Sequence, residues 1–307
     1  MNSNLKKVPP AAEKKPAVSY WSKAKVMCPV CKKGFMREEM LSGGGRMIAG
    51  SLTDELQRLY EPSEKFGKVY PLLYAVGACP TCHLALLWND FKEVADEKSV
   101  ARLHDDEESR RRKAFTIFPY YDVTKERTLF DGAAMYYLAL LSYEQLDPKY
   151  AITFKRGVIS LRLAWLCTEL QGLVPDRNYA YIAQVFYRKA TFFYQQTLVN
   201  ETTGVETIGS VTNFGPDIDK NYGYDGVTYL SALLEYKYGQ RAVLPQRYQT
   251  LAANKRAIAR LFGLGKASKS KPGPLLEHAR VLYETLAKEL SDANTLDLDD
   301  EDAEEDA

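Results

Sequence analysis

The chain has 307 residues, 46% of them hydrophobic and 26% charged, which is enough for a substantial buried core in one or two domains. A formal net charge of +1 argues against a protein drawn to nucleic acid or anionic lipid by its overall field. The sequence has no run of about 18 apolar residues, which excludes a membrane-spanning helix.

The N-terminal segment 1–24 is rich in Lys, Pro and Ala and is predicted to be a disordered basic arm. It has no apolar stretch of the kind that a secretory signal requires, so we expect a cytoplasmic protein. In a reducing cytoplasm, paired cysteines are more often metal ligands than disulfides.

Residues 25–92 carry two C-P-x-C pairs, in KVMCPVCKKGF and GACPTCHLALLWNDF, with 47 residues (32–78) between the pairs. On a tight turn, two cysteines separated by two residues can direct both sulfurs at one point, and a proline in each turn fixes φ at about −65°. Zn²⁺ prefers four tetrahedral ligands and binds thiolate sulfur well. This segment is therefore predicted to be a zinc-ribbon-like module with an insertion. Its predicted zinc ligands are Cys28, Cys31, Cys79 and Cys82.

Other chemistry for the four cysteines is less favoured by the pattern. No βαβ unit surrounds either pair, which disfavours a thioredoxin-like redox dithiol. A redox dithiol, an iron–sulfur centre and coincidence remain the alternatives. His83 directly follows Cys82, and with four cysteines present we expect it beside the site or at the surface rather than as a ligand.

The insertion contains the segment LTDELQRLY (52–60), which is predicted to form one short helix with Ser51 or Thr53 as its cap. The segment KVYPLLYAVGAC (68–79) is β-branched and aromatic, which predicts a strand that enters the second cysteine pair.

Residues 93–118 form a highly charged connector, in which acids at 105–108 precede bases at 110–113. On a helix these residues make favourable pairs four positions apart. The pattern therefore predicts a solvated helical connector rather than a binding patch.

From residue 119 to 290 the sequence is predicted to be helical, with amphipathic spacing and breaks at Pro or Gly. The predicted helices are 128–146, 152–172, 178–198, 224–239, 244–263 and 273–290. Their order indicates antiparallel hairpins in a degenerate tetratricopeptide-like array, with a compact bundle as the alternative. The expected fold class is thus mainly α. Residues 291–307, with nine acids and no base, are predicted to be a disordered acidic tail.

The cysteine pairs and the helices together resemble a family of uncharacterised bacterial proteins that combine an N-terminal zinc ribbon with tetratricopeptide-like helices. The resemblance lies within residues 25–290, in VMCPVCKKGF, YAVGACPTCHLALLWNDF, AAMYYLALLSYEQL, RLAWLCTELQG and KPGPLLEHARVLYETL. The family's second pair reads C-P-x-C-G-Y-A, whereas His83 and Leu84 stand here in place of Gly and Tyr. The resemblance implies zinc binding and protein interaction, and it supplies no activity.

No catalytic constellation or phosphate-binding loop is visible in the sequence, so we expect a protein that is not an enzyme. The leading hypothesis is a cytoplasmic adaptor or scaffold, in which a structural Zn²⁺ folds the N-terminal module and the helices offer a groove to a protein partner. The alternative is a nucleic-acid-binding zinc-ribbon protein with a regulatory role, whose contacts would be Lys32, Lys33 and Arg37.

Overall fold

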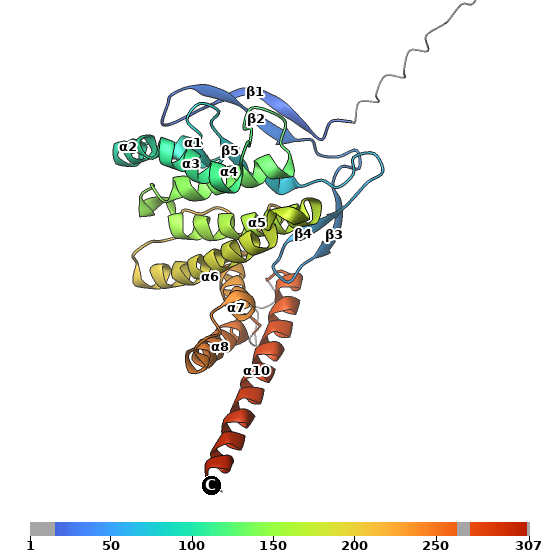
Figure 1. Cartoon of the computed structure of the whole chain (residues 1–307), viewed down its shortest axis with the longest axis vertical. Helices are drawn as coiled ribbons and strands as arrows, with labels where there is room; N and C mark the ends of the chain where they lie inside the picture. The colour runs from blue at the N-terminus through green and yellow to red at the C-terminus, as the bar shows by residue number, and fades with distance from the viewer. Residues whose placement is uncertain (1–15, 263–270, 306–307) are drawn as a thin grey trace, which may run out of the picture.

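The computed structural model describes residues 16–262 and 271–305, and the side chains of the last helix up to Asp292. These residues form a mainly helical protein, with antiparallel strand pairs in its N-terminal part (Figure 1). Each of these sheets has only two strands. Because an isolated two-stranded hairpin is marginally stable in water, the helices packed against the strands contribute to their stability.

Two of the hairpins carry the cysteines in their turns. β1 (Ser19–Met27) pairs with β2 (Gly34–Met40), and β5 (Val76–Ala78) pairs with β6 (Ala85–Leu87). The pairing between β1 and β2 is irregular between Trp21 and Lys25, whereas β5 and β6 pair without a shift. Both β5 and β6 contact the first long helix, so the second cysteine pair sits directly on the helical part of the molecule.

The segment 68–79, predicted as one strand, is a strand only at its end. Pro71–Tyr74 form a 3-10 helix, η1, and β5 covers Val76–Ala78 alone. Proline suits the first position of a helix, because its φ is already near the helical value and its missing N–H would have no partner there.

The insertion forms a hairpin, so the prediction of a helix at 52–60 is wrong. β3 (Ile48–Leu52) pairs antiparallel with β4 (Arg58–Glu61). At the tip of this hairpin Glu55 is buried, and Trp165 Nε1 donates to its carboxylate at 2.5 Å. Such a tertiary contact outweighs the weak helix propensity of a short segment.

Helices make up most of the chain after residue 89. They are α1 (Asp90–Glu93), α2 (Glu97–Asp105), α3 (Glu107–Ile117), α4 (Leu129–Tyr143), η2 (Pro148–Tyr150), α5 (Ile152–Leu173), η3 (Pro175–Arg177), α6 (Tyr179–Thr203), α7 (Gly223–Tyr238), α8 (Leu244–Ala259) and α10 (Gly273–Glu305). From α4 to α8 each long helix packs on the next, and α10 packs on α8 and α7 (Figure 1). Among the described residues, no helix is long and apolar enough to cross a membrane.

Local sequence signals explain several helix ends. The Thr128 hydroxyl caps α4 by accepting a hydrogen bond from the Asp131 N–H. Asp147 does the same for η2, where Pro148 breaks the chain between α4 and α5. Gly204, with a φ of 71°, ends α6 in the left-handed conformation that favours glycine.

The ends of the chain differ from the predicted boundaries. β1 begins at Ser19, within the segment 1–24 predicted as an arm, while residues 1–15 lie outside the described part of the chain. α10 extends through most of 291–307, which the sequence predicts as a tail. The last buried side chain on the described part of α10 is Leu286.

A buried ion pair joins the first hairpin to the helical part. Arg127 Nε lies 3.2 Å from Glu38 Oε2, and their side chains are 3% and 0% exposed. Ser19 donates to the same carboxylate at 2.6 Å, and Arg127 also donates to the carbonyls of Leu73 and Val76. Because Arg127 directly precedes the cap of α4, these bonds place β2, η1 and β5 at the start of the helical stack.

Arg127→Met is expected to lower the free energy of unfolding by about 3–5 kcal/mol, because it leaves the Glu38 carboxylate buried without a counter-charge. Urea denaturation of the wild type and the variant measures the difference. Arg112→Met, at an exposed position, is the control and should change stability by less than about 0.5 kcal/mol. A loss in Arg127→Met as small as that of the control would refute the role given to the ion pair.

Candidate metal centre

The two C-P-x-C turns have the same backbone structure. In each turn the N–H of the first cysteine donates to the carbonyl five residues later, at 3.0 and 2.8 Å. The N–H four residues after that cysteine donates back to its carbonyl, at 3.1 and 2.9 Å. Lys32 and His83 occupy this equivalent position, and both have a left-handed φ, of 58° and 53°. The repeated sequence is therefore also a repeated structure.

The structure brings the four predicted ligands together. The Sγ atoms of Cys28 and Cys82 are 3.5 Å apart, those of Cys31 and Cys79 are 3.6 Å apart, and all four lie within 4.8 Å of one another. Cys31 is partly exposed, and the other three are buried. Since the two pairs belong to separate hairpins, the tertiary fold assembles this group.

The geometry and chemistry of the group fit a metal ion. A tetrahedral Zn²⁺ with bonds of about 2.3 Å to sulfur has sulfur–sulfur edges of about 3.8 Å. The two short contacts of 3.5 and 3.6 Å are close to that edge. Within the described residues the group consists of four thiols without a carboxylate or imidazole, and such soft ligands suit Zn²⁺ or iron rather than Mg²⁺ or Ca²⁺.

The thiols affect one another's protonation. Hydrogen bonds from Cys28 and Cys82 lower the pKa of Cys79 well below its usual range, and the backbone N–H groups of Cys82 and Thr81 add to this effect. The hydrogen bond with Cys79, together with burial, raises the pKa of Cys28. Hydrogen bonds with Cys28 and Cys79, together with burial, raise the pKa of Cys82. The arrangement thus stabilises a thiolate at Cys79, and a bound cation would favour the ionised form of all four sulfurs.

His83 lies beside this group and is not a member of it. Its Nδ1 is 2.6 Å from the hydroxyl of Tyr121, and the two rings pack edge to face. Burial, followed by the charges of Arg111 and Arg110, lowers the pKa of His83 to about 4. The left-handed φ at this position also explains why glycine suits the family pattern there, because glycine adopts it without strain.

Arg110 is a site residue that the sequence interpretation missed. It is 0% exposed, and its Nη2 and Nε donate to the carbonyls of Cys82 and His83 at 3.0 and 3.2 Å. Asp106, one helical turn earlier, lies 3.3 Å from Nη1. The expectation of a solvated connector is therefore wrong at this residue, which holds the second cysteine turn against α3.

The sequence does contain a signal for the burial of Arg110. Ala114 and Phe118 are buried 4 and 8 residues after Arg110, a spacing that places them on the same side of α3 and its C-terminal end. The surrounding run of charged residues hid this face, because the acids and bases alone predict a solvated helix.

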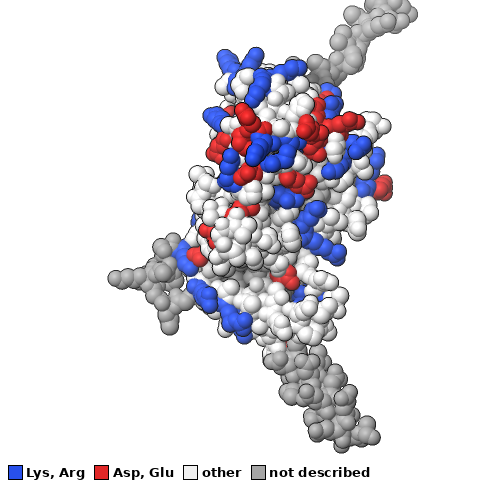
Figure 2. Space-filling view, turned by 90° about the vertical axis from the view of Figure 1, so that its left-hand side faces the viewer, with Lys and Arg blue, Asp and Glu red and all other residues white. Residues whose placement is uncertain are grey.

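The three basic residues named for the nucleic-acid alternative differ in their surroundings. Lys32 Nζ donates to the Pro29 carbonyl of its own turn at 2.6 Å, and the Arg37 guanidinium lies 4.8 Å from the centre of the Trp88 ring. Lys33 is exposed, and its side chain has no polar contact among the described residues. Figure 2 shows Lys and Arg mixed with Asp and Glu over the upper part of the visible face, rather than a field of one sign.

The fold and the cysteine group define a class: a mainly helical protein with an N-terminal four-cysteine centre. The chain belongs to the family described as "Uncharacterized protein conserved in bacteria (DUF2225)", whose model matches residues 21–286 and so includes both cysteine pairs. This confirms the resemblance to a family of uncharacterised bacterial proteins. A protein of Borreliella burgdorferi (strain ATCC 35210 / DSM 4680 / CIP 102532 / B31), called "Uncharacterized protein", is 39% identical over 274 residues, which is 89% of this chain and 98% of that protein. No solved structure matches the chain.

Arg110→Met is expected to lower the free energy of unfolding by about 2–4 kcal/mol, because buried carbonyls of the second cysteine turn lose their charged donor. It should also speed the release of metal to a chelating dye, since that turn is no longer held against α3. Denaturation and dye assays measure the two effects, with the exposed neighbour Arg111→Met as the control. Metal release at the wild-type rate in a destabilised Arg110→Met would show that this arginine does not support the centre.

Proposed function

We propose that the protein is a non-enzymatic cytoplasmic adaptor, in which a structural Zn²⁺ holds the two cysteine turns together and the helices offer a surface to a protein partner. The observation that carries the proposal is the convergence of four sulfurs within 4.8 Å. A structural zinc centre with four thiolates has no open position for a substrate, which supports a role in architecture rather than turnover.

The pairing of the sulfurs favours zinc over a redox dithiol. Sulfur–sulfur contacts of 3.5 and 3.6 Å join the two turns, Cys28 with Cys82 and Cys31 with Cys79. A dithiol of the thioredoxin kind uses the two sulfurs of one C-x-x-C motif. Contacts across the two turns, at distances near the edge of a tetrahedron, instead support one ion shared by both.

The helices support the proposed docking role. From α4 to α8 each helix packs on its successor, as expected for a degenerate tetratricopeptide-like array. On α6, Tyr181, Phe192 and Val199 are 65%, 57% and 52% exposed. Their spacings of 11 and 7 residues place them on one side of the helix, which they share with the exposed Arg188. Exposed aromatic residues beside an arginine are typical of a protein-binding surface.

Metal analysis of the purified protein is expected to give about one zinc per chain, as a four-thiolate site requires. Cys79→Ser should lower this ratio, whereas Cys167→Ala should leave it unchanged, because Cys167 is buried on α5 outside the cysteine group. Chelation of the metal should first expose the amides of β1, β2, β5 and β6 to hydrogen exchange. Iron in place of zinc, or a ratio near zero, would contradict the zinc assignment.

Removal of the exposed aromatic side chains of α6, in Tyr181→Ala combined with Phe192→Ala, is expected to reduce partner recovery at least tenfold in quantitative affinity capture, since buried aromatic anchors dominate binding energy. The matched control combines Tyr120→Ala with Val281→Ala, which are 86% and 63% exposed on other segments. Equal recovery by both double variants would exclude this surface without affecting the zinc assignment.

A further inference from the structure

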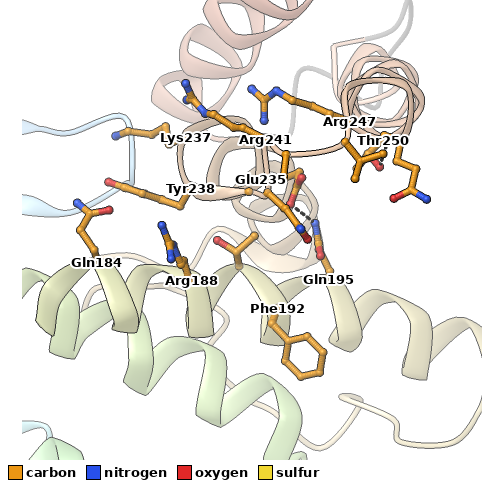
Figure 3. A pocket seen from close by; sticks show the side chains of 16 residues that line it. Gln184, Arg188, Phe192, Gln195, Glu235, Lys237, Tyr238, Arg241, Arg247 and Thr250 are labelled. Carbon is orange, nitrogen blue, oxygen red and sulfur yellow. Dashed lines mark hydrogen bonds between the residues drawn. The ribbon is translucent and has the colours of Figure 1, made fainter. Parts of the chain in front are cut away.

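A polar cleft lies between α6 and the segment that joins α7 to α8. Its volume is about 790 Å³, within the range of small-molecule sites. Figure 3 shows Gln184, Arg188 and Gln195 projecting from α6 toward the segment that carries Arg241. In Figure 1 these helices lie toward the opposite end of the stack from β1 and β2, so the cleft is separate from the cysteine centre.

Hydrogen-bond donors dominate the lining of this cleft. Its neutral donors are the amides of Gln184, Gln195, Gln240 and Gln246. The hydroxyls of Thr191 and Thr250 also line the cleft, but they donate to the carbonyls of Tyr187 and Gln246. A small ligand that carries many acceptor oxygens would find partners on both walls.

The charge of the lining is strongly positive. Its charged residues are the bases Arg188, Lys237, Arg241 and Arg247 and the acid Glu235. Lys237 forms an ion pair with Glu55 at 2.7 Å, so the inserted hairpin neutralises its charge. Arg188 and Arg241 are exposed and have no acidic partner among the described residues. Two guanidinium groups on facing walls are thus available to a ligand.

The two buried charged residues of the lining, Arg247 and Glu235, do not cancel the positive charge of Arg188 and Arg241. The Arg247 side chain is 4% exposed and pairs with Glu289 at 2.9 Å, but its Nη1 is buried without a hydrogen-bond partner in the described part of the chain. The Glu235 carboxylate accepts a hydrogen bond from Gln195 Nε2 at 2.7 Å, so a neutral amide satisfies one of its oxygens.

The start of α8 adds a further positive potential. Val243 occupies the cap position and has no side-chain acceptor for the first turn, and Pro245 follows within that turn. The N–H groups of Leu244 and Gln246 therefore have no acceptor within the helix. Val243 and Gln246 both line the cleft, so this uncapped helix start faces the same space as the arginines.

We propose that this cleft binds a small molecule that carries phosphate groups, held by the guanidinium groups of Arg188 and Arg241 and by the start of α8. Arginine forks match the oxygens of a phosphate, and the amide donors around them suit its remaining oxygens. The cleft is walled by α6 on one side and by the end of α7, the segment 239–243 and the start of α8 on the other. Its volume of about 790 Å³ suits a compact ligand. This binding goes beyond the adaptor role; Phe192 of the exposed face of α6 also lines the cleft, and the arginine variants below leave it unchanged.

Titration calorimetry of the full, metal-loaded chain with inorganic pyrophosphate and with ADP tests the proposal. Both probes are expected to bind, and adenosine is not. Arg188→Gln combined with Arg241→Gln should weaken binding by at least about 10-fold, because two charge-assisted contacts are lost. Both residues are exposed, so circular dichroism and the melting temperature should stay at their wild-type values.

The matched control removes the same charge from exposed positions outside the cleft, in Arg256→Gln combined with Arg260→Gln. It should bind both probes within about twofold of the wild type, as expected for charges that do not touch the ligand. If the wild type binds neither probe, or if both double variants lose affinity for the probes equally, the proposal is overturned. Tight binding of a synthetic peptide of residues 291–307 with no binding of pyrophosphate would also overturn it, and would instead assign the cleft to acidic peptides.

Discussion

The convergence of four cysteine sulfurs from two hairpin turns is the constraint on which the N-terminal part of this protein depends. Its sheets are two-stranded, and such hairpins are marginal on their own. An ion shared by the turns would stabilise both hairpins, because a site absent from the unfolded chain makes binding energy available to folding. The 47 residues between the pairs are no obstacle, since the entropy of loop closure changes only slowly with loop length.

Four buried charged residues connect the N-terminal hairpins to the helices. Arg110 holds the second cysteine turn through backbone carbonyls, and Arg127 joins Glu38 of the first hairpin to the start of α4. Glu55, at the tip of the inserted hairpin, accepts hydrogen bonds from helices α5 and α7. Buried charges are costly unless they are paired, so each of these residues specifies one position of a hairpin on the helical stack. The stack in turn carries the exposed face of α6 and the cationic cleft.

Much of this organisation could be predicted from the sequence, and the errors have physical causes. The doubled C-P-x-C pattern predicted the group of four cysteines because a turn that places two sulfurs together is local. The long helices could be predicted because they have strong periodicity and clear ends. The hairpin at 48–61 and the burial of Arg110 were not predicted from these local patterns. Glu55 and Arg110 are charged residues whose partners lie on other segments. Local propensity therefore predicted a short helix at 52–60, and the charge pattern predicted a solvated helix around Arg110. The cleft is likewise assembled from separate segments, α6 and residues 235–250.

X-ray absorption at the zinc edge of the purified full chain would show directly whether one zinc ion is bound by four thiolates in a closed site. We expect a single shell of four sulfur atoms at about 2.3 Å. A shell that includes nitrogen or oxygen, such as three sulfurs and a water, would exclude the closed site and point to an open position for chemistry.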